Sequence, residues 1–346
     1  MTIPSAEPRP GIIDLHAHHV ARELIEAVRK DGGAHNVRLA IDGQQRTWVE
    51  LSGRSANAPL APALSDIDAR LAWMDERGIG AQLLAGWMDL SAYNLPLADA
   101  KWFTRLQNET LAACVRAHPE RFFAAAAVPL QAPQAAVAEL EYAVKTLGMR
   151  AVQIGAEVEG RALDDPWFDP FWEAATGLDV AIVIHPVDAG SNPPARRYFL
   201  HISCGNPAAT TAAAAALMLG GVLERWPNLR FLLVHGGGFL PYQFSRFERS
   251  WHVAPPAYKA AAPHPPSHYL RRFYFDSMLH DAAALELLAR FAGPDRVVFG
   301  SDYPFPMGIE EPQDNVAAVA SILGRGAETL MRDGALSFLA CDRSAA

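Results

Sequence analysis

The 346-residue sequence contains little cysteine, no long basic stretch and no hydrophobic run long enough to cross a bilayer. Its three cysteines, Cys114, Cys204 and Cys341, lie far apart and form no Cys-x-x-Cys pair. This distribution provides neither a disulfide framework nor a thiolate zinc site. It favours a reducing compartment, so we expect a cytoplasmic protein.

Charge and hydropathy exclude two further classes of partner. The formal net charge is −8 at pH 7 and is spread without a basic cluster, which gives no electrostatic footprint for nucleic acid or for an anionic membrane. Residues Met1 to Pro10 show no apolar core behind a basic start, and the alanine-rich run from Ala212 to Leu219 is too short to span a membrane. We therefore expect a soluble protein that acts on a small molecule.

Eight short apolar runs, typical of parallel strands that are buried on both faces, alternate with segments of helical periodicity. The runs are Gly11–His16, Ala81–Trp87, Phe122–Leu130, Ala151–Gly155, Val180–His185, Arg230–His235, Phe273–Ser277 and Arg296–Asp302. Helices are expected between them, for example over Ala132–Leu147 and Ala282–Ala292. Because every parallel connection needs a covering helix, the pattern predicts an α/β fold of the (β/α)8 barrel type, with an open doubly wound sheet as the alternative.

One segment interrupts this alternation. Residues 19–65 are rich in glycine, arginine, asparagine and proline, and only residues 46–51 show a weak strand-like pattern. We interpret the segment as an insertion after the first strand, folded as a small β-rich lobe or lid over the mouth of the barrel. No repeat or linker separates two large domains, so residues 1–346 are predicted to form one barrel domain.

Two histidines end the first apolar run. His16 and His18 are two residues apart, and on a strand such residues project to the same face, where two imidazoles can share one cation. Taken alone, the pair is equally consistent with a polar strand end near the surface.

Polar residues end three other apolar runs in the same way: His185, His235 and Asp302. In a barrel these strand ends converge on one mouth, where active sites are built. Packing explains them poorly, because each would bring an unpaired polar group into the same buried space. We predict that His16, His18, His185 and Asp302 bind one divalent ion, that His235 is the general acid/base, and that Asp302 belongs with it to the catalytic residues.

The predicted donor set indicates a single ion. Three imidazoles and a carboxylate suit Zn²⁺ and leave a position open for water. Two-metal barrel sites of this kind need a bridging carboxylate, commonly a carboxylated lysine at the end of the fourth strand. The run Ala151–Gly155 ends without one, so we expect one ion, with zinc favoured.

With these residues in view, the sequence resembles the 2-amino-3-carboxymuconate-6-semialdehyde decarboxylase-like family of the amidohydrolase superfamily, over nearly the whole chain. The motifs that carry the resemblance are Asp14-Leu15-His16-Ala17-His18, Gln131-Ala132-Pro133, Val152-Gln153-Ile154-Gly155, His185-Pro186-Val187-Asp188, His235-Gly236-Gly237-Gly238 and Asp302-Tyr303-Pro304-Phe305-Pro306. The early His-x-His pair marks only the superfamily, whereas the Gln-Ala-Pro, His-Gly-Gly-Gly and Asp-Tyr-Pro-Phe-Pro stretches are specific to the decarboxylase branch.

The resemblance implies the same four metal ligands and the same catalytic residue, His235. It also implies that Arg246 reaches the site of a neighbouring subunit and binds a substrate carboxylate there, which makes a homodimer the expected active unit. A second family arginine, in the insertion, corresponds to Arg54 or less well to Arg46.

The sequence departs from the family around the substrate. Val187 stands where the family has tryptophan, and residues 198–205 replace a tryptophan-bearing stretch, so the pocket is expected to have a different shape. His201 in this stretch is a candidate substrate contact, although a histidine there can equally be structural. The remaining histidines away from strand ends are interpreted as structural or solvated: His118, His252, His264, His268 and His280.

The predicted activity is nonoxidative decarboxylation of a small unsaturated or aromatic carboxylic acid, similar to 2-amino-3-carboxymuconate semialdehyde or to a hydroxybenzoate. The same scaffold also supports a hydrolase or hydratase acting on an amide, a lactone or an enol acid, since fold does not decide chemistry. A catalytically silent binding or assembly subunit is a third possibility, against which the complete ligand set and the retained His235 argue.

Overall fold

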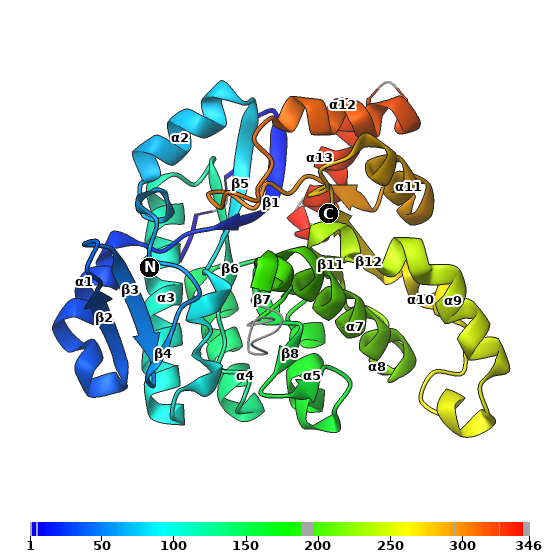
Figure 1. Ribbon diagram of the computed structural model, residues 1–346, viewed down its shortest axis with the longest axis horizontal. Helices are drawn as coiled ribbons and strands as arrows, with labels where there is room; N and C mark the ends of the chain where they lie inside the picture. Colours follow the sequence, from blue (N-terminus) through cyan, green and yellow to red (C-terminus); the bar gives the residue numbers. More distant parts are fainter. Residues whose placement is uncertain (1, 5, 188–196, 294, 325, 342–346) are drawn as a thin grey trace.

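Eight parallel strands form the centre of the computed structural model, which describes residues 2–4, 6–187, 197–293, 295–324 and 326–341. Their order around the sheet is β1-β5-β6-β7-β10-β11-β12-β13 (Figure 1). The bounds are Ile12–His18 for β1, Ile79–Ala85 for β5, Phe122–Ala126 for β6, Ala151–Gly155 for β7, Ala181–His185 for β10, Phe231–Leu233 for β11, Phe273–Asp276 for β12 and Val297–Val298 for β13. Each neighbouring pair is parallel, as the sequence predicts.

The first and last strands close the sheet into a barrel. The amide of Leu15 donates to the carbonyl of Phe299 at 2.9 Å, and the amide of His18 donates to the carbonyl of Tyr303 at 2.8 Å. The (β/α)8 prediction is confirmed, and an open sheet is excluded. Strand β13 is shorter than the predicted run, because beyond it the chain bends and pairs with β1 only through isolated bridges.

Both faces of the strands are buried. In β10, Ala181 and Val183 face the apolar interior of the barrel, whereas Ile182 and Ile184 pack against the surrounding helices. This double burial explains why the strands read as continuous apolar runs rather than as alternating patterns.

The helices cover the barrel, and their ends follow local sequence signals. Helix α11 spans the predicted Ala282–Ala292 and begins at Asp281, whose carboxylate accepts hydrogen bonds from the amides of Ala283 and Ala284. The predicted helix over 132–147 is divided into α4, Pro133–Glu141, and a π-helical turn, Tyr142–Leu147. The other long helices are α2 (Ile67–Glu76), α3 (Leu97–Ala117), α5 (Asp169–Gly177), α7 (Asn206–Leu219), α9 (Leu240–Val253), α12 (Pro312–Leu323) and α13 (Ala327–Phe338). Within the described ranges, no helix combines the length and the apolar character needed to cross a membrane.

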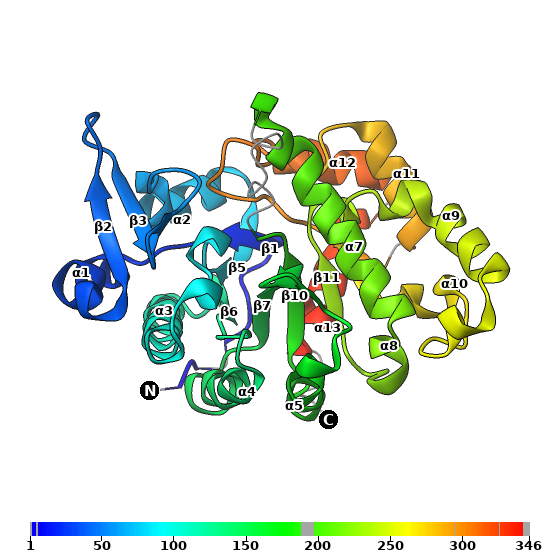
Figure 2. The same cartoon turned by 60° about the horizontal axis from the view of Figure 1, so that its bottom comes forward.

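The segment between β1 and α2 forms a unit of its own beside the barrel. It consists of helix α1 (Arg22–Asp31) and a small antiparallel sheet of β2 (Val37–Ile41), β3 (Thr47–Leu51) and β4 (Arg54–Ser55). Figures 1 and 2 show this unit at one side of the molecule. Its buried residues, including Val37 and Leu51, share an apolar cluster with Phe103 of α3, apart from the two clusters of the barrel.

Candidate active site

Five polar side chains meet where the barrel strands end. His16 and His18 come from β1, His185 from β10, His235 from the turn after β11, and Asp302 from the segment after β13. One donor atom each from His16, His18, His185 and Asp302 lies within 4.8 Å of the other three. The Nε2 atoms of His18 and His16 lie 3.1 and 3.5 Å from Oδ1 of Asp302. The four residues predicted as ligands are therefore brought together.

The residues present fit a divalent metal ion. The Nε2 atoms of His16 and His18 are buried and have no hydrogen-bond partner among the described residues. Leaving a buried polar atom unpaired costs about 1–3 kcal/mol, so two such atoms beside one carboxylate need an explanation. A shared cation supplies it, and three imidazoles with a carboxylate are suitable ligands for one.

The second nitrogen of each ligand histidine is held by the protein. The pairs are Nδ1 of His16 with Oδ2 of Asp276 at 2.7 Å, Nδ1 of His18 with the carbonyl of Gly86 at 3.2 Å, and Nδ1 of His185 with the carbonyl of Pro186 at 2.8 Å. Each partner is an acceptor, so each Nδ1 carries the proton and Nε2 keeps its lone pair for the ion.

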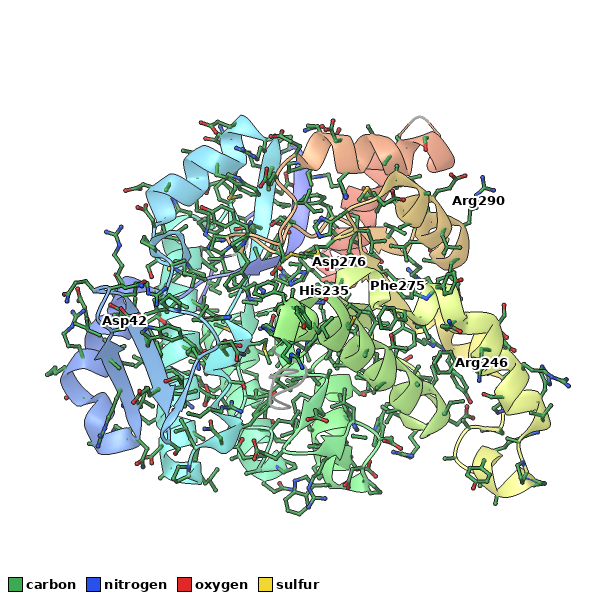
Figure 3. The ribbon with its side chains drawn as sticks, viewed as in Figure 1. Asp42, His235, Arg246, Phe275, Asp276 and Arg290 are labelled. Carbon is green, nitrogen blue, oxygen red and sulfur yellow. The ribbon has the colours of Figure 1, made fainter. Side chains whose placement is uncertain are left out.

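Asp276, the partner of His16, is a functional residue that the sequence analysis missed. It is fully buried at the end of β12. Its Oδ1 accepts from the amide of Gly236 at 2.7 Å and from that of Met278 at 3.3 Å. One carboxylate thus orients a ligand histidine and the turn that carries His235 (Figure 3). The signal was present in the sequence, because Asp276 ends a buried strand as the other site residues do.

His235 lies beside the ligands but outside their group. Its ring centroid is 5.3 Å from that of His16 and 5.4 Å from that of His185. Its Nδ1 is buried without a hydrogen-bond partner in the described part of the chain. Burial, with the neighbouring imidazoles, lowers the pKa of His235 to about 4. The ring is therefore neutral near pH 7 and has the capacity to accept a proton.

The backbone is unusual at two residues of the site, the ligand Asp302 and the neighbouring His235. Asp302 has φ 59° and His235 has φ 57°, in the left-handed region that residues other than glycine rarely adopt. His235 belongs to a tight turn rather than to β11, so the predicted strand 230–235 is too long. Gly238 allows this turn to approach α7 closely, because a Cβ there would lie 2.1 Å from the carbonyl oxygen of Pro207.

The carboxylate of Asp302 is ionised. Burial alone would raise its pKa, but the adjacent His16 and His18 hold the pKa well below its usual value. Burial also lowers the pKa of His185 well below the ordinary range. Asp302 and Asp276 instead raise the pKa of His16, so an ion bound there would displace a proton from its ring.

A buried polar network supports the ligand-bearing backbone from behind. Asp14 accepts from the amide of His16 at 3.1 Å, from Nε2 of Gln82 at 2.7 Å and from the amide of Ser301 at 3.0 Å. The guanidinium of Arg70, on α2, donates to Oε1 of Gln82 and to the carbonyl of His18. Burial lowers the pKa of Arg70 to about 10, which leaves it protonated at neutral pH. The network joins α2 to β1 and to the segment after β13, which carry His16, His18 and Asp302.

The three residues predicted to contact the substrate lie outside the group of metal ligands. Arg246 is exposed on α9, away from His235 in Figure 3. Arg54, in β4, lines a small cavity with Met88 and Asp89, which follow β5 and therefore lie on the side of the mouth. His201 begins a π-helical turn before α7, and its Nδ1 is buried without a partner in the described ranges. Asp188, a residue of the family motif, lies outside the described residues.

The comparisons with known proteins identify the family of the chain. Residues 13–327 match the Amidohydrolase family, and the chain belongs to that family. Within the family it is similar to 2-amino-3-carboxymuconate-6-semialdehyde decarboxylase of Dictyostelium discoideum, with 31% identity over 95% of this chain and 92% of the relative. It is also 32% identical to gamma-resorcylate decarboxylase of Polaromonas sp., over 75% of this chain and 81% of the relative.

Among solved structures, the chain is similar to a dihydroxybenzoic acid decarboxylase from Polaromonas sp. determined with bound manganese and the inhibitor 2-nitroresorcinol. The TM-score is 0.76 at 24% identity, and the match covers 98% of both chains. The resemblance predicted from the motifs is confirmed. These relatives support the decarboxylase prediction over the hydrolase or hydratase alternative.

Proposed function

We propose that the protein removes CO2, without oxidation, from a small unsaturated or aromatic carboxylic acid related to 2-amino-3-carboxymuconate semialdehyde or to a hydroxybenzoate. The observation that carries this proposal is that the mouth holds four metal-ligand side chains and a separate fifth side chain that can move a proton. Four donors converge within 4.8 Å of one another, and a fifth side chain, His235, stays beside them with a free, buried nitrogen.

His16, His18, His185 and Asp302 would hold the ion, which when bound supplies a Lewis acid next to the substrate oxygens. Loss of CO2 breaks a carbon–carbon bond and leaves its electron pair on the substrate carbon, which must then take up a proton. His235 is the group proposed to move that proton, since it is neutral near pH 7 and buried against the ligands.

Arg246 is proposed to bind a substrate carboxylate of a neighbouring subunit in a homodimer. It lies on an exposed stripe of α9 with Tyr242 and Val253, whose exposed fractions are 78% and 59%. An exposed stripe with an aromatic and an apolar residue around an arginine is suited to cover by a second copy. Mixing Arg246→Ala with His235→Ala chains should restore activity in hybrid dimers. No recovery would place the arginine outside the partner's site.

Arg54 and His201 are proposed as further substrate contacts. Arg46 offers a matched control for Arg54, because its Nε already donates to Oδ2 of Asp42 at 2.8 Å. Arg54→Ala should raise KM while Arg46→Ala leaves it unchanged, and the reverse result would reassign the contact. His201→Ala should likewise raise KM. The free energy of unfolding should stay close to that of the wild type, which would separate a substrate contact from a structural role.

The ion is proposed to be Zn²⁺, because imidazole nitrogens dominate the donor set. Manganese is the rival, since it is bound in the similar Polaromonas structure. Chelated protein reloaded with one equivalent of either ion, and assayed for kcat, distinguishes them.

A reducing, cytoplasmic location is also proposed, on the basis of the three free cysteines.

The direct test is mass spectrometry of products after the metal-loaded protein meets a panel of carboxymuconate semialdehydes, hydroxybenzoates, lactones and aryl amides. Loss of CO2 from any acid supports the proposal and identifies the substrate class. Gain of water with every carboxylate intact would overturn it in favour of a hydratase or hydrolase. No turnover by metal-loaded protein would favour the binding-subunit alternative.

A further inference from the structure

A second group of metal-ligand side chains lies far from the barrel mouth. It consists of Glu224 in the short helix α8 (Val222–Arg225), His264, and His268 in α10 (Pro266–Tyr269). One donor atom from each lies within 4.8 Å of the other two, and all three side chains are exposed. Figure 2 shows α8 and α10 near α9, on the side of the molecule opposite the insertion. Both histidines were predicted to be structural or solvated.

The contacts of the three donors leave them able to face one ion. The rings of His264 and His268 are stacked, with centroids 4.2 Å apart and planes at 25°. Oε2 of Glu224 accepts a hydrogen bond from the hydroxyl of Tyr269 at 2.9 Å. The adjacent Arg225 pairs with Asp169 instead, at 3.2 Å. The carboxylate thus keeps free lone pairs beside two imidazoles, and Tyr269 orients it as outer partners orient metal ligands.

The backbone holds the two halves of this group in place without an ion. Gly221, with φ 80°, lies directly before α8, and a Cβ there would be 2.2 Å from the carbonyl oxygen of Ala261. The segment that carries the histidines therefore touches the start of α8. The amide of Ser267 also donates to the carboxylate of Glu248 on α9. A site whose ligands are already positioned loses less entropy when it binds.

We propose that Glu224, His264 and His268 bind a second divalent ion of the borderline class, with Zn²⁺ as the representative, separate from the ion of the barrel. Two imidazoles and a carboxylate are a known three-ligand set for zinc, with water in the remaining position. The ion joins α8 to the segment that follows α9. This site has no part in the proposed decarboxylation, so either assignment can fail alone.

The test uses protein whose barrel site is already loaded. Zn²⁺ is titrated by calorimetry, and bound zinc per chain is counted by elemental analysis after desalting. The wild type should bind one ion more than the His264→Ala/His268→Ala variant, and decarboxylase activity should be equal in both. A wild type that takes up no further ion, or a double variant that retains it, overturns the proposal.

Two more variants complete the design. His252→Ala/His280→Ala removes two exposed histidines that lie outside the group, and it should keep the second ion with unchanged affinity. Glu224→Gln removes only the exposed carboxylate charge and serves where the double histidine variant fails to fold. It should weaken Zn²⁺ binding by about tenfold or more. Unchanged affinity in Glu224→Gln would also contradict the site.

Discussion

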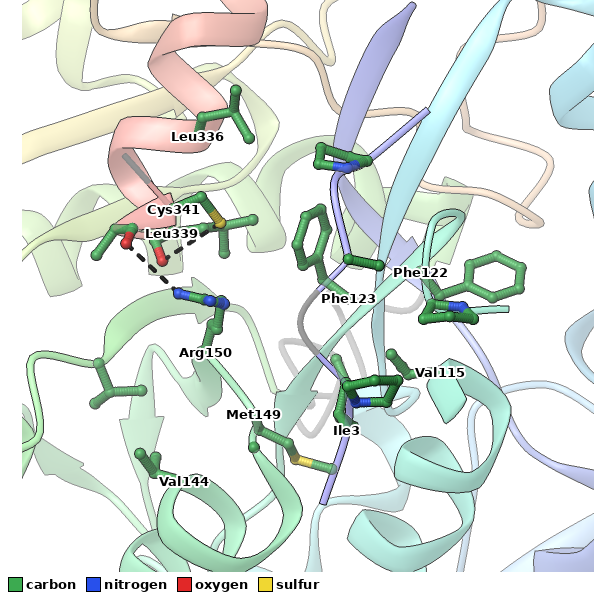
Figure 4. Close-up of a pocket in the computed structure, with 18 of the residues that line it drawn as sticks. Ile3, Val115, Phe122, Phe123, Val144, Met149, Arg150, Leu336, Leu339 and Cys341 are labelled. Atoms are coloured by element: carbon green, nitrogen blue, oxygen red, sulfur yellow. Dashed lines mark hydrogen bonds between the residues drawn. The ribbon is translucent and has the colours of Figure 1, made fainter. Parts of the chain in front are cut away.

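The two ends of the barrel differ in what they hold. At the mouth, where the strands end, buried polar groups converge and two residues adopt left-handed backbone. At the opposite end, where the strands begin, a cavity of about 850 Å³ is lined by residues such as Phe123, Met149 and Leu336 (Figure 4). This cavity has no cluster of metal ligands among its described lining residues.

This difference shows that a large cavity and a cluster of reactive side chains need not occupy the same place in the fold. Strand ends concentrate polar side chains at the mouth because all eight strands run in one direction. The opposite end carries the starts of the strands and α13, and its residues determine stability rather than reaction. A change at the mouth should therefore affect activity or metal content, and a change at the other end should not.

The largest effect is expected from His235→Ala at the mouth. Removing the group proposed to move the proton should lower kcat by about 10²- to 10⁴-fold, because that is what a positioned acid or base contributes. Steady-state kinetics measures the loss, and elemental analysis should find the metal retained. Loss of the metal together with activity would show that His235 is a ligand, contrary to its place outside the ligand group.

A smaller effect is expected from Asp276→Asn. The carboxylate that orients His16 would become an amide of the same size, and metal affinity should fall about 10- to 100-fold. Competition with a chelator measures the affinity. Asp281→Asn, which changes only the cap of α11, is the control and should leave metal affinity unchanged. Equal affinities in all three proteins would refute the role of Asp276.

Arg70→Met tests the network behind the mouth. It leaves Oε1 of Gln82 and the carbonyl of His18 without their donor, so the free energy of unfolding should fall by about 1–3 kcal/mol. Urea denaturation measures the change. The exposed Arg29→Met on α1 should change it by less than about 0.5 kcal/mol. An unaffected Arg70→Met would mean that the network does not support the fold.

Acid should destabilise the protein through the buried His19. Burial lowers the pKa of His19 to about 3, and the ring lies beside Sγ of Cys114 at 3.5 Å. Below pH ~6.5 the imidazole of His19 binds a proton in the unfolded chain but not in the folded chain. The free energy of unfolding is therefore unaffected above that pH and falls as the pH is lowered towards 3. The slope for one such histidine approaches about 1.4 kcal/mol per pH unit. Denaturation midpoints at pH 7 and 5 should differ less in His19→Gln than in the wild type.

The smallest effect is expected at the other end of the barrel. Leu336 is half-buried beside the cavity, so Leu336→Ala should cost less than the 2–5 kcal/mol typical of a fully packed leucine. Its kcat should stay within about twofold of the wild type, since catalysis depends on the mouth. Leu232→Ala, inside the barrel, is the packed reference. A strong loss of activity in Leu336→Ala would break the separation between the two ends.

The arrangement of the site could be predicted where its signals are local. Apolar runs ending in His185, His235 or Asp302 identify strands and place the polar residue at the same end of each. The structure brings these residues together with His16 and His18 as expected. The barrel follows from the same pattern, because eight such runs alternate with helices.

The supporting residues could not be predicted in the same way, because their partners are distant in sequence. Asp14 bonds to Ser301, and Arg70 reaches His18 from a helix whose apolar pattern gives no sign of a buried guanidinium. Left-handed backbone at Asp302 arises from tertiary bonding after β13, which also explains the error in that strand's length. The role proposed for Arg246 involves a second chain, so the fold of one chain does not test it.

The seam of the barrel has a consequence for how the protein is made. The strand that carries His16 and His18 is closed by the segment around Asp302, so the fold and the ion site are completed by the same pairing. During synthesis the histidines emerge first, and the aspartate follows only when most of the chain has left the ribosome. An ion that binds before the barrel closes can contact only the histidines. All four donors are in place only after the segment around Asp302 has paired with β1.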